Sequence, residues 1–224
     1  MNAVPALAFV CAMPMEARPL ARKLRLPRAD VGGVKGYRKG AVVAVVTGMG
    51  PRRAAAATRQ LLSAVPVDRV VVVGITGAVD ERAPIGSLVV PETVVDGATG
   101  AEYRPAPLRG LTNQGRMWTS ATIMTEPSAI VDDGVIALDM ETAAVAAVCE
   151  AHGTPWSVVR AVSDRGLDHD VVGLSSDDGP PGVGAALRYV VRHPGRVAGL
   201  VRLGRDAARA AERAAEAAVR ATAS

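Results

Sequence analysis

The stretch from Val135 to Asp164 constrains the fold of this 224-residue chain more than any other. It opens with an apolar run, Val135–Leu138, and continues into an alanine-rich segment, Glu141–Ala151, whose small residues suit a helix packed closely on a sheet. Gly153 ends that helix, and a second apolar run follows over Trp156–Val162. The pattern predicts a right-handed βαβ unit in which the two strands are parallel neighbours.

Two carboxylates, Glu141 and Asp164, follow the two strands of this unit. Parallel strands bring their carboxyl ends to the same edge of a sheet, and open α/β sheets bind ligands at that edge. We therefore expect the two side chains to lie side by side, one as an acid and the other as an anchor for the bound ligand.

The preceding chain repeats the pattern of a buried strand followed by a short turn. Three such strands are expected, at Ala6–Ala12, Ala41–Thr47 and Arg69–Val73. Glu16 follows the first in the opening turn of a helix, where the helix dipole alone also favours a carboxylate. Gly48-Met49-Gly50-Pro51 follows the second, and indicates either an anion or ribose site or a plain tight turn before a helix over Arg52–Ala64. A small-residue loop over Gly74–Ala78 is expected after the third.

Weaker signals predict the remaining segments. They are a hairpin at 31–40, strands within 86–95 and 116–124, a polar loop at 98–114, and helices at 184–191 and 196–223. Residues 165–182 are polar and rich in glycine and proline, and we expect them to form a flexible lid beside the ligand-binding edge. Residues 1–224 are thus predicted to form one α/β domain.

Composition excludes several classes of protein. Hydrophobic residues make up 49% of the chain but aromatic residues only 3%, so the core must consist mainly of Val, Ala and Leu. A nucleic-acid partner is not expected, because basic stripes with interleaved aromatics are missing. The C-terminal helix is basic on balance, yet it lacks the bulky aromatics of membrane-surface helices, so a membrane-surface role is the weaker alternative.

No metal or other cofactor is predicted. Cys11 and Cys149 each lie in an apolar run, and the Cys149–His152 spacing lacks the further ligands that a metal site needs. No apolar run approaches the ~18 residues of a membrane span. The N-terminus lacks the positively charged segment of a signal peptide, so a cytoplasmic protein is expected.

Four segments, in this order and spacing, resemble the nucleoside phosphorylase and nucleosidase superfamily, and most nearly its methylthioadenosine/S-adenosylhomocysteine nucleosidases. They are MPMEARPL, TGMGPRRAAAATRQLL, VVVGITGAVD and LDMETAAVAAVCEAHGTPWSVVRAVSD. The resemblance implies a single α/β domain with a central mixed, partly barrel-like β-sheet flanked by helices in three layers. A homo-oligomer, with a dimer favoured, is also expected.

The resemblance implies a role for each matching residue in cleaving the bond between a purine and C1′ of a ribose. Asp164, oriented by Ser163, protonates the departing base and must hold a proton near neutral pH. Glu141 grips the ribose hydroxyls, Met140 packs on the ribose face, and Arg160 orders the region. Further substrate contacts are expected from Gly48, Ile75, Thr76, Gly77, Ile123 and Met124. Ile123 or Met124 would pack on the base where the nucleosidases usually carry an aromatic side chain.

The residue at position 16 distinguishes two reactions. Phosphorylases of the superfamily place a phosphate-binding arginine near this position, whereas the nucleosidases place a glutamate that activates a water. A base beside the anomeric carbon favours hydrolysis, and its negative charge opposes phosphate. Glu16 therefore predicts a nucleosidase that hydrolyses a 5′-substituted adenine nucleoside.

Two alternatives stay open. The first is a phosphorylase, including one that cleaves adenosylhopane, because the segment RHPGRVAGLVRLGRDAARAAERAA is similar to hopanoid-associated members of the superfamily. The second is a non-catalytic nucleoside-binding protein, which would keep Glu141 but would tolerate the loss of Asp164 as an acid.

Overall fold

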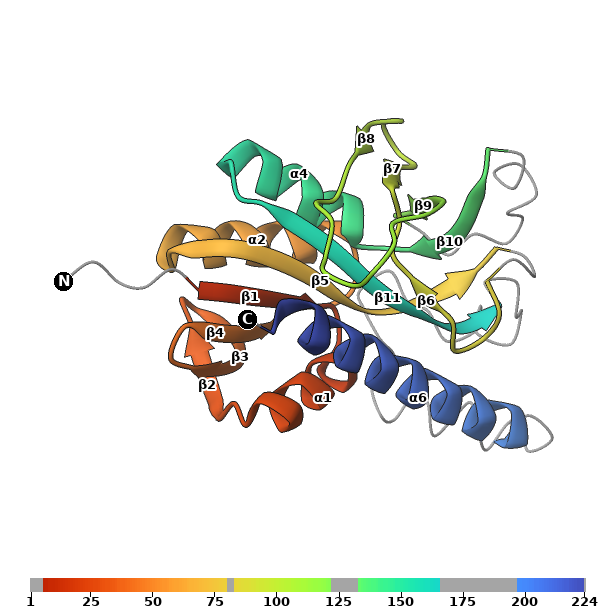
Figure 1. Cartoon of the computed structure of the whole chain (residues 1–224), viewed down its shortest axis with the longest axis horizontal. Coiled ribbons are helices and arrows are strands. Elements are labelled where there is room, and N and C mark those ends of the chain that lie inside the picture. Colours follow the sequence, from red (N-terminus) through yellow and green to blue (C-terminus); the bar gives the residue numbers. More distant parts are fainter. Residues whose placement is uncertain (1–5, 80–82, 122–132, 166–196, 224) are drawn as a thin grey trace.

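The computed structural model describes residues 6–79, 83–121, 133–165 and 197–223. Its middle layer is a mixed sheet (Figure 1) in the order β2-β3-β4-β1-β5-β10-β9-β7-β8, in which β11 also pairs with β5 and β6 pairs with β11. The strands are β1 Ala6–Cys11, β2 Arg28–Val31, β3 Val34–Lys39, β4 Val42–Val46, β5 Val67–Ala78, β6 Leu88–Val89, β7 Thr93–Asp96, β8 Glu102–Tyr103, β9 Arg116–Thr119, β10 Val135–Asp139 and β11 Trp156–Arg165.

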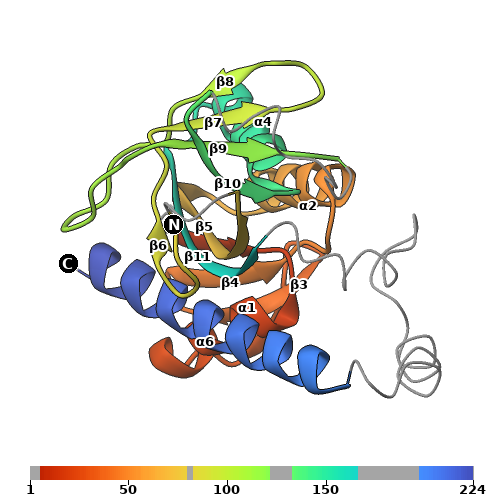
Figure 2. The same cartoon turned by 90° about the vertical axis from the view of Figure 1, so that its right-hand side faces the viewer.

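Helices cover both faces of this sheet, which confirms the three-layer α/β architecture. They are α1 Pro14–Leu24, α2 Pro51–Ala64, α4 Thr142–His152 and α6 Val197–Thr222. Figures 1 and 2 show α1 and α6 together on one face, and α2 lies beside α4 on the other. The buried side chains between the layers are chiefly valine and alanine, as the composition predicts.

The 12-residue strand β5 is the centre of the sheet. Its first half pairs with β1 in parallel, and residues Val70–Ala78 pair in parallel with β11 on the opposite edge. Beyond the end of β1, the last two residues of β5, Gly77 and Ala78, pair with β10 in the antiparallel direction. One strand thus pairs with three others, and two of them, β10 and β11, meet it near its carboxyl end.

The predicted βαβ unit over Val135–Asp164 is wrong in its strand pairing. Its strands, β10 and β11, are not neighbours, because β5 lies between them and runs antiparallel to one and parallel to the other. Both strands nevertheless reach the same residue of β5 near their carboxyl ends. Leu138 of β10 and Asp164 of β11 both pair with Gly77 of β5, from opposite sides.

The predicted loop over Gly74–Ala78 is also wrong, since β5 continues through it to Ala78. Glycine indicates a turn only when no other element approaches closely, and it also occurs in strands where another group must pass near the backbone. Gly74 is such a case. A Cβ atom there would overlap Glu16 Oε1 and lie 2.7 Å from Arg160 Nη1.

The other predictions from local patterns agree well with the structure. The hairpin at 31–40 is β2–β3, Gly153 ends α4 with φ +73°, and the long C-terminal helix is α6. The polar loop at 98–114 contains the short strand β8, and β9 ends earlier than expected, at Thr119. The predicted helix at 184–191 and the predicted lid lie outside the described residues, apart from Arg165, which ends β11.

Candidate active site

The side chain of Arg160, in the middle of β11, is the centre of a buried polar cluster. It is only 2% exposed. Its Nη2 atom donates to Asp139 Oδ2 at 2.5 Å and to Thr142 Oγ1 at 2.9 Å, while its Nη1 atom donates to the Ile75 carbonyl at 3.0 Å. Nη1 also lies 3.7 Å from Glu16 Oε1. One guanidinium therefore joins β5, β10, α1 and α4.

Glu16 lies at the third position of α1, and its side chain is 1% exposed. Its Oε2 accepts the N–H of Met13 at 2.8 Å, and its Oε1 accepts the N–H of Ile75 at 2.9 Å. The Met13 contact is the capping-box bond of a helix start, whereas the Ile75 contact ties the carboxylate to the central strand. Burial raises the pKa of Glu16, although Arg160 and the backbone donors oppose this effect.

Glu141 is the N-cap residue of α4, and it binds the start of the neighbouring helix. Its Oε1 accepts the N–H of Gly50, the N-cap residue of α2, at 2.7 Å. Its Oε2 lies 3.9 Å from Arg160 Nη2. Burial and the adjacent charge of Asp139 raise the pKa of Glu141 to about 7. The turn before α2, for which the sequence indicates either an anion or ribose site or a plain tight turn, therefore holds a carboxylate of the protein itself.

Asp139, the last residue of β10, is a member of the cluster that the sequence analysis missed. Its Oδ1 accepts from Thr119 Oγ1 at 2.6 Å, and its Oδ2 accepts the N–H of Thr142 at 2.9 Å as well as the Arg160 guanidinium. The Thr142 hydroxyl also donates to Oδ2. The spacing of Asp139 and Thr142, where an aspartate accepts from a backbone N–H three residues later at a helix start, could have revealed it.

Asp164 lies on β11 opposite Gly77 and is partly buried. The hydroxyl of Ser163 donates to Asp164 Oδ2 at 2.5 Å, so the expected pairing of these two residues is present. Thr76 Oγ1 donates to the carbonyl of Leu138 at 2.5 Å, which joins β5 to the end of β10. Met140, also partly buried, follows β10 directly.

The remaining predicted contacts divide into two groups. Gly48 adopts φ +88° in the turn after β4, and its N–H bonds to the carbonyl of Ala12 beyond the end of β1. Ile75, Thr76 and Gly77 belong to β5 within the cluster rather than to a loop. The other two predicted contacts, Ile123 and Met124, lie outside the described residues.

Cations other than Arg160 take no part in the cluster contacts described above. Among the described residues, no group of three or more His, Cys, Asp or Glu side chains is arranged to hold a metal ion. The cluster therefore opposes three carboxylates, Glu16, Asp139 and Glu141, to one guanidinium. Such a site favours a reacting group that develops positive charge.

The sequence profile of the phosphorylase superfamily matches residues 6–114 and 109–179, which is most of the chain. This chain belongs to the phosphorylase superfamily. No curated protein matches the sequence significantly.

Solved structures with the phosphorylase-superfamily fold superpose on nearly the whole chain. A Helicobacter pylori 5′-methylthioadenosine/S-adenosylhomocysteine nucleosidase, in complex with butyl-thio-DADMe-Immucillin-A, is 14% identical with a TM-score of 0.70, covering 95% of both chains. A futalosine hydrolase of the same organism is 14% identical with a TM-score of 0.71, covering 96% of both. A Colwellia psychrerythraea 5′-methylthioadenosine/S-adenosylhomocysteine nucleosidase with adenine is 20% identical with a TM-score of 0.68, covering 96% of this chain and 93% of that one. These likenesses establish the fold.

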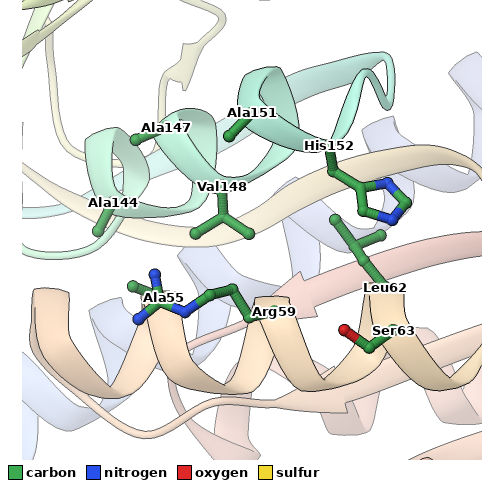
Figure 3. Close-up of a pocket in the computed structure, with 9 residues that line it drawn as sticks. All are labelled: Ala55, Arg59, Leu62, Ser63, Ala144, Ala147, Val148, Ala151 and His152. Carbon is green, nitrogen blue, oxygen red and sulfur yellow. The ribbon is translucent and has the colours of Figure 1, made fainter.

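Away from the Arg160 cluster, this phosphorylase-superfamily chain has a groove between α2 and α4 (Figure 3). It has a volume of about 350 Å³ and is lined by Ala55, Arg59, Leu62, Ser63, Ala144, Ala147, Val148, Ala151 and His152. None of these residues belongs to the carboxylate cluster, and no carboxylate lines the groove. The candidate active site is therefore the Arg160 cluster and not this groove.

Gly74 gives a test of the cluster that does not depend on a change of charge. In Gly74→Ala, the added methyl group must displace the Glu16 carboxylate or the Arg160 guanidinium, because the new Cβ atom would overlap Glu16 Oε1 and lie only 2.7 Å from Arg160 Nη1. A displacement of about 1 Å near reacting groups costs on the order of 10²-fold in rate. We expect that loss in kcat. Gly204→Ala in α6, where nothing lies within 4 Å of the added atom, is the control and should retain full activity.

Proposed function

We propose that this chain is a nucleosidase that hydrolyses the N-glycosidic bond of a 5′-substituted adenine nucleoside. The observation that carries this proposal is the position of Glu16. Its carboxylate occupies the backbone donors of Met13 and Ile75 and lies beside Arg160, so the donors that an incoming phosphate would need already bind a carboxylate. Burial raises the pKa of Glu16, which makes it a stronger base than a free carboxylate.

Glu141 is proposed to bind the ribose hydroxyls. Gly50 holds its Oε1 atom, so Oε2 is the oxygen that accepts from the diol. Met140, next to it in the chain, is proposed to pack on the ribose face. With both glutamates ionised, the cluster places net negative charge beside the sugar. That charge stabilises the positive charge that develops on the ribose as the bond to the base breaks.

Asp164 is proposed as the general acid, with Ser163 orienting its carboxyl group. In the reaction, the C1′–N9 bond breaks and its electron pair leaves with the purine, which takes a proton at N7 from Asp164. Water attacks C1′ and gives a proton to Glu16. The products are free adenine and the free 5′-substituted ribose, and no group other than water is consumed.

Phosphorolysis is the second candidate reaction, because members of the superfamily carry out both. The cluster disfavours it, since a phosphate at C1′ would lie among three carboxylates with one guanidinium to offset them. A non-catalytic nucleoside-binding protein is the third candidate. The pairing of Ser163 with Asp164, which suits a positioned acid, favours an enzyme.

One experiment separates these functions. Purified protein is incubated with 5′-methylthioadenosine, S-adenosylhomocysteine, futalosine and adenosylhopane, each with and without phosphate, and both products are analysed. We expect free base and a free sugar at rates that do not depend on phosphate. A sugar 1-phosphate would identify a phosphorylase, and binding without release of base would identify a binding protein. The preferred substrate identifies the 5′-group.

We also infer that the protein forms a homodimer in the cytoplasm, as its resemblance to the nucleosidases suggests. No helix in the described part of the chain is long and apolar enough to cross a membrane. Light scattering on the purified 23.0-kDa chain should give about twice that mass. A single-chain mass across the concentration range would contradict the dimer.

A further inference from the structure

We propose that Asp139 is a positioning residue that restrains the Arg160 guanidinium and so keeps it from pairing closely with Glu16 and Glu141. This role depends on the proposed nucleosidase reaction, in which Asp139 takes no direct part. It accounts for a buried aspartate that contacts the same guanidinium as Glu16 and Glu141, the two glutamates to which that reaction assigns roles.

Hydrogen bonds from three neighbouring elements hold the Asp139 carboxylate in place. Its carboxylate accepts from Thr119 on β9, from the backbone N–H and the hydroxyl of Thr142 on α4, and from Arg160 on β11. Its side chain is 2% exposed. A carboxylate with this many donors has little freedom to move. The three elements that meet around it therefore fix its place.

The distances show which carboxylate takes the guanidinium. Arg160 lies 2.5 Å from Asp139, but 3.7 Å from Glu16 and 3.9 Å from Glu141. Only the first is a close ion pair. The Thr142 hydroxyl, 2.9 Å from Arg160 Nη2, reinforces it by bonding to both partners. The other arm of the guanidinium donates to the Ile75 carbonyl, and the N–H of that same residue donates to Glu16.

This arrangement has a chemical consequence for the two glutamates. A guanidinium in close contact with a carboxylate neutralises it and weakens it as a base. Held at its present distances, Arg160 lowers the pKa of Glu16 and of Glu141 less than a direct pair would. Without Asp139, the freed guanidinium could close the remaining distance to either glutamate. Glu16 would then lose basicity, and Glu141 would lose an acceptor for the ribose.

Two measurements on Asp139→Asn test this role. The first is adenine release from 5′-methylthioadenosine over a range of pH. We expect kcat to fall on the order of 10²-fold, because a catalytic base is displaced or neutralised. KM should rise as well, because the freed guanidinium would take the Glu141 oxygen that faces it, while Gly50 still holds only the other oxygen. The acid limb of the pH profile should move to lower pH. Besides Asp139, the ionisable groups that face Glu141 are Glu16 and Arg160.

The second measurement needs no activity. Glutamate carboxyl groups labelled with carbon-13 are titrated by NMR, and in Asp139→Asn both Glu16 and Glu141 should titrate at lower pH than in the unaltered protein. Thr142→Ala removes the hydroxyl that bridges Asp139 and Arg160 but keeps every charge, so it should shift both titrations in the same direction by less. Asp139→Glu keeps the charge and should restore part of kcat.

Asp96→Asn is the matched control. Asp96 ends β7 and Asp139 ends β10, and both pair with Thr119 of β9, but the side chain of Asp96 accepts from the N–H of Ala98. This variant should match the unaltered protein in kcat and in both titrations. If Asp139→Asn and Thr142→Ala leave the glutamate titrations unchanged, Asp139 does not restrain Arg160 and the proposal is wrong. If the unaltered protein releases no adenine, the nucleosidase function fails, while the titrations still decide the role of Asp139.

Discussion

Replacing Asp164 with asparagine should lower kcat for adenine release about 10³-fold, within the range that a general acid contributes. An amide of the same shape still accepts the Ser163 hydrogen bond, but it has no proton to give to N7 of the departing purine. The unfavourable step is departure of an unprotonated adenine anion. Steady-state kinetics with 5′-methylthioadenosine measure the loss.

The leaving group provides the control for this prediction. A 5′-substituted p-nitrophenyl riboside releases a stable phenolate without protonation, so the Asp164→Asn variant should hydrolyse it at nearly the rate of the unaltered protein. Equal losses with both substrates would mean that the substitution damages the fold or the binding of ribose. Asp164 would then not be the acid.

Replacing Glu16 should abolish hydrolysis in a way that a small carboxylate can reverse. Glu16→Ala removes the proposed base and leaves the N–H groups of Met13 and Ile75, with Arg160, around a space of carboxylate size. We expect kcat to fall about 10³-fold, as for the loss of a general base. Formate, which has the charge and shape of the missing group, should restore part of the rate. The measurement is kcat against formate concentration.

Glu16→Gln is the matched variant for this experiment. Its amide fills the space that formate would occupy, so it should show the same loss of activity without rescue. Activity close to that of the unaltered protein in Glu16→Gln would contradict the role of Glu16 as a base, and would favour phosphorolysis. The product sugar formed by Glu16→Ala in phosphate buffer shows whether an anion in this position can itself attack C1′.

Local patterns were enough to predict most elements of the fold but not how two of them pair. The strands near Ala6, Ala41 and Arg69 were found because each is a short apolar run between turn residues. The predicted pairing of β10 with β11 is wrong because it rests on the rule that strands adjacent in the chain are neighbours in the sheet. That rule fails here because β5 is long enough to continue past the end of β1 and to pair with both strands.

In the candidate site too, residues marked by a nearby sequence pattern could be predicted, whereas those that depend on contacts distant in the chain could not. Glu16, Glu141 and Asp164 were found because carboxylates after apolar runs resemble a known arrangement. Gly74 was read as a turn, because the side chains that need its small size lie 58 and 86 residues away in the chain. No local pattern carries that information. Asp139 differs, since its spacing to Thr142 is a local signal.

The bond between Glu141 and Gly50 also bears on how the protein folds. It joins residues 91 positions apart, so the first turn of α2 leaves the ribosome long before its acceptor is synthesised. Contacts between such distant residues form late, because a large loop must close first. We expect the helix start at Gly50 to fray in nascent chains that stop short of residue 141. The carboxylate proposed to hold the sugar would then also make one of the last contacts to form between the starts of α2 and α4.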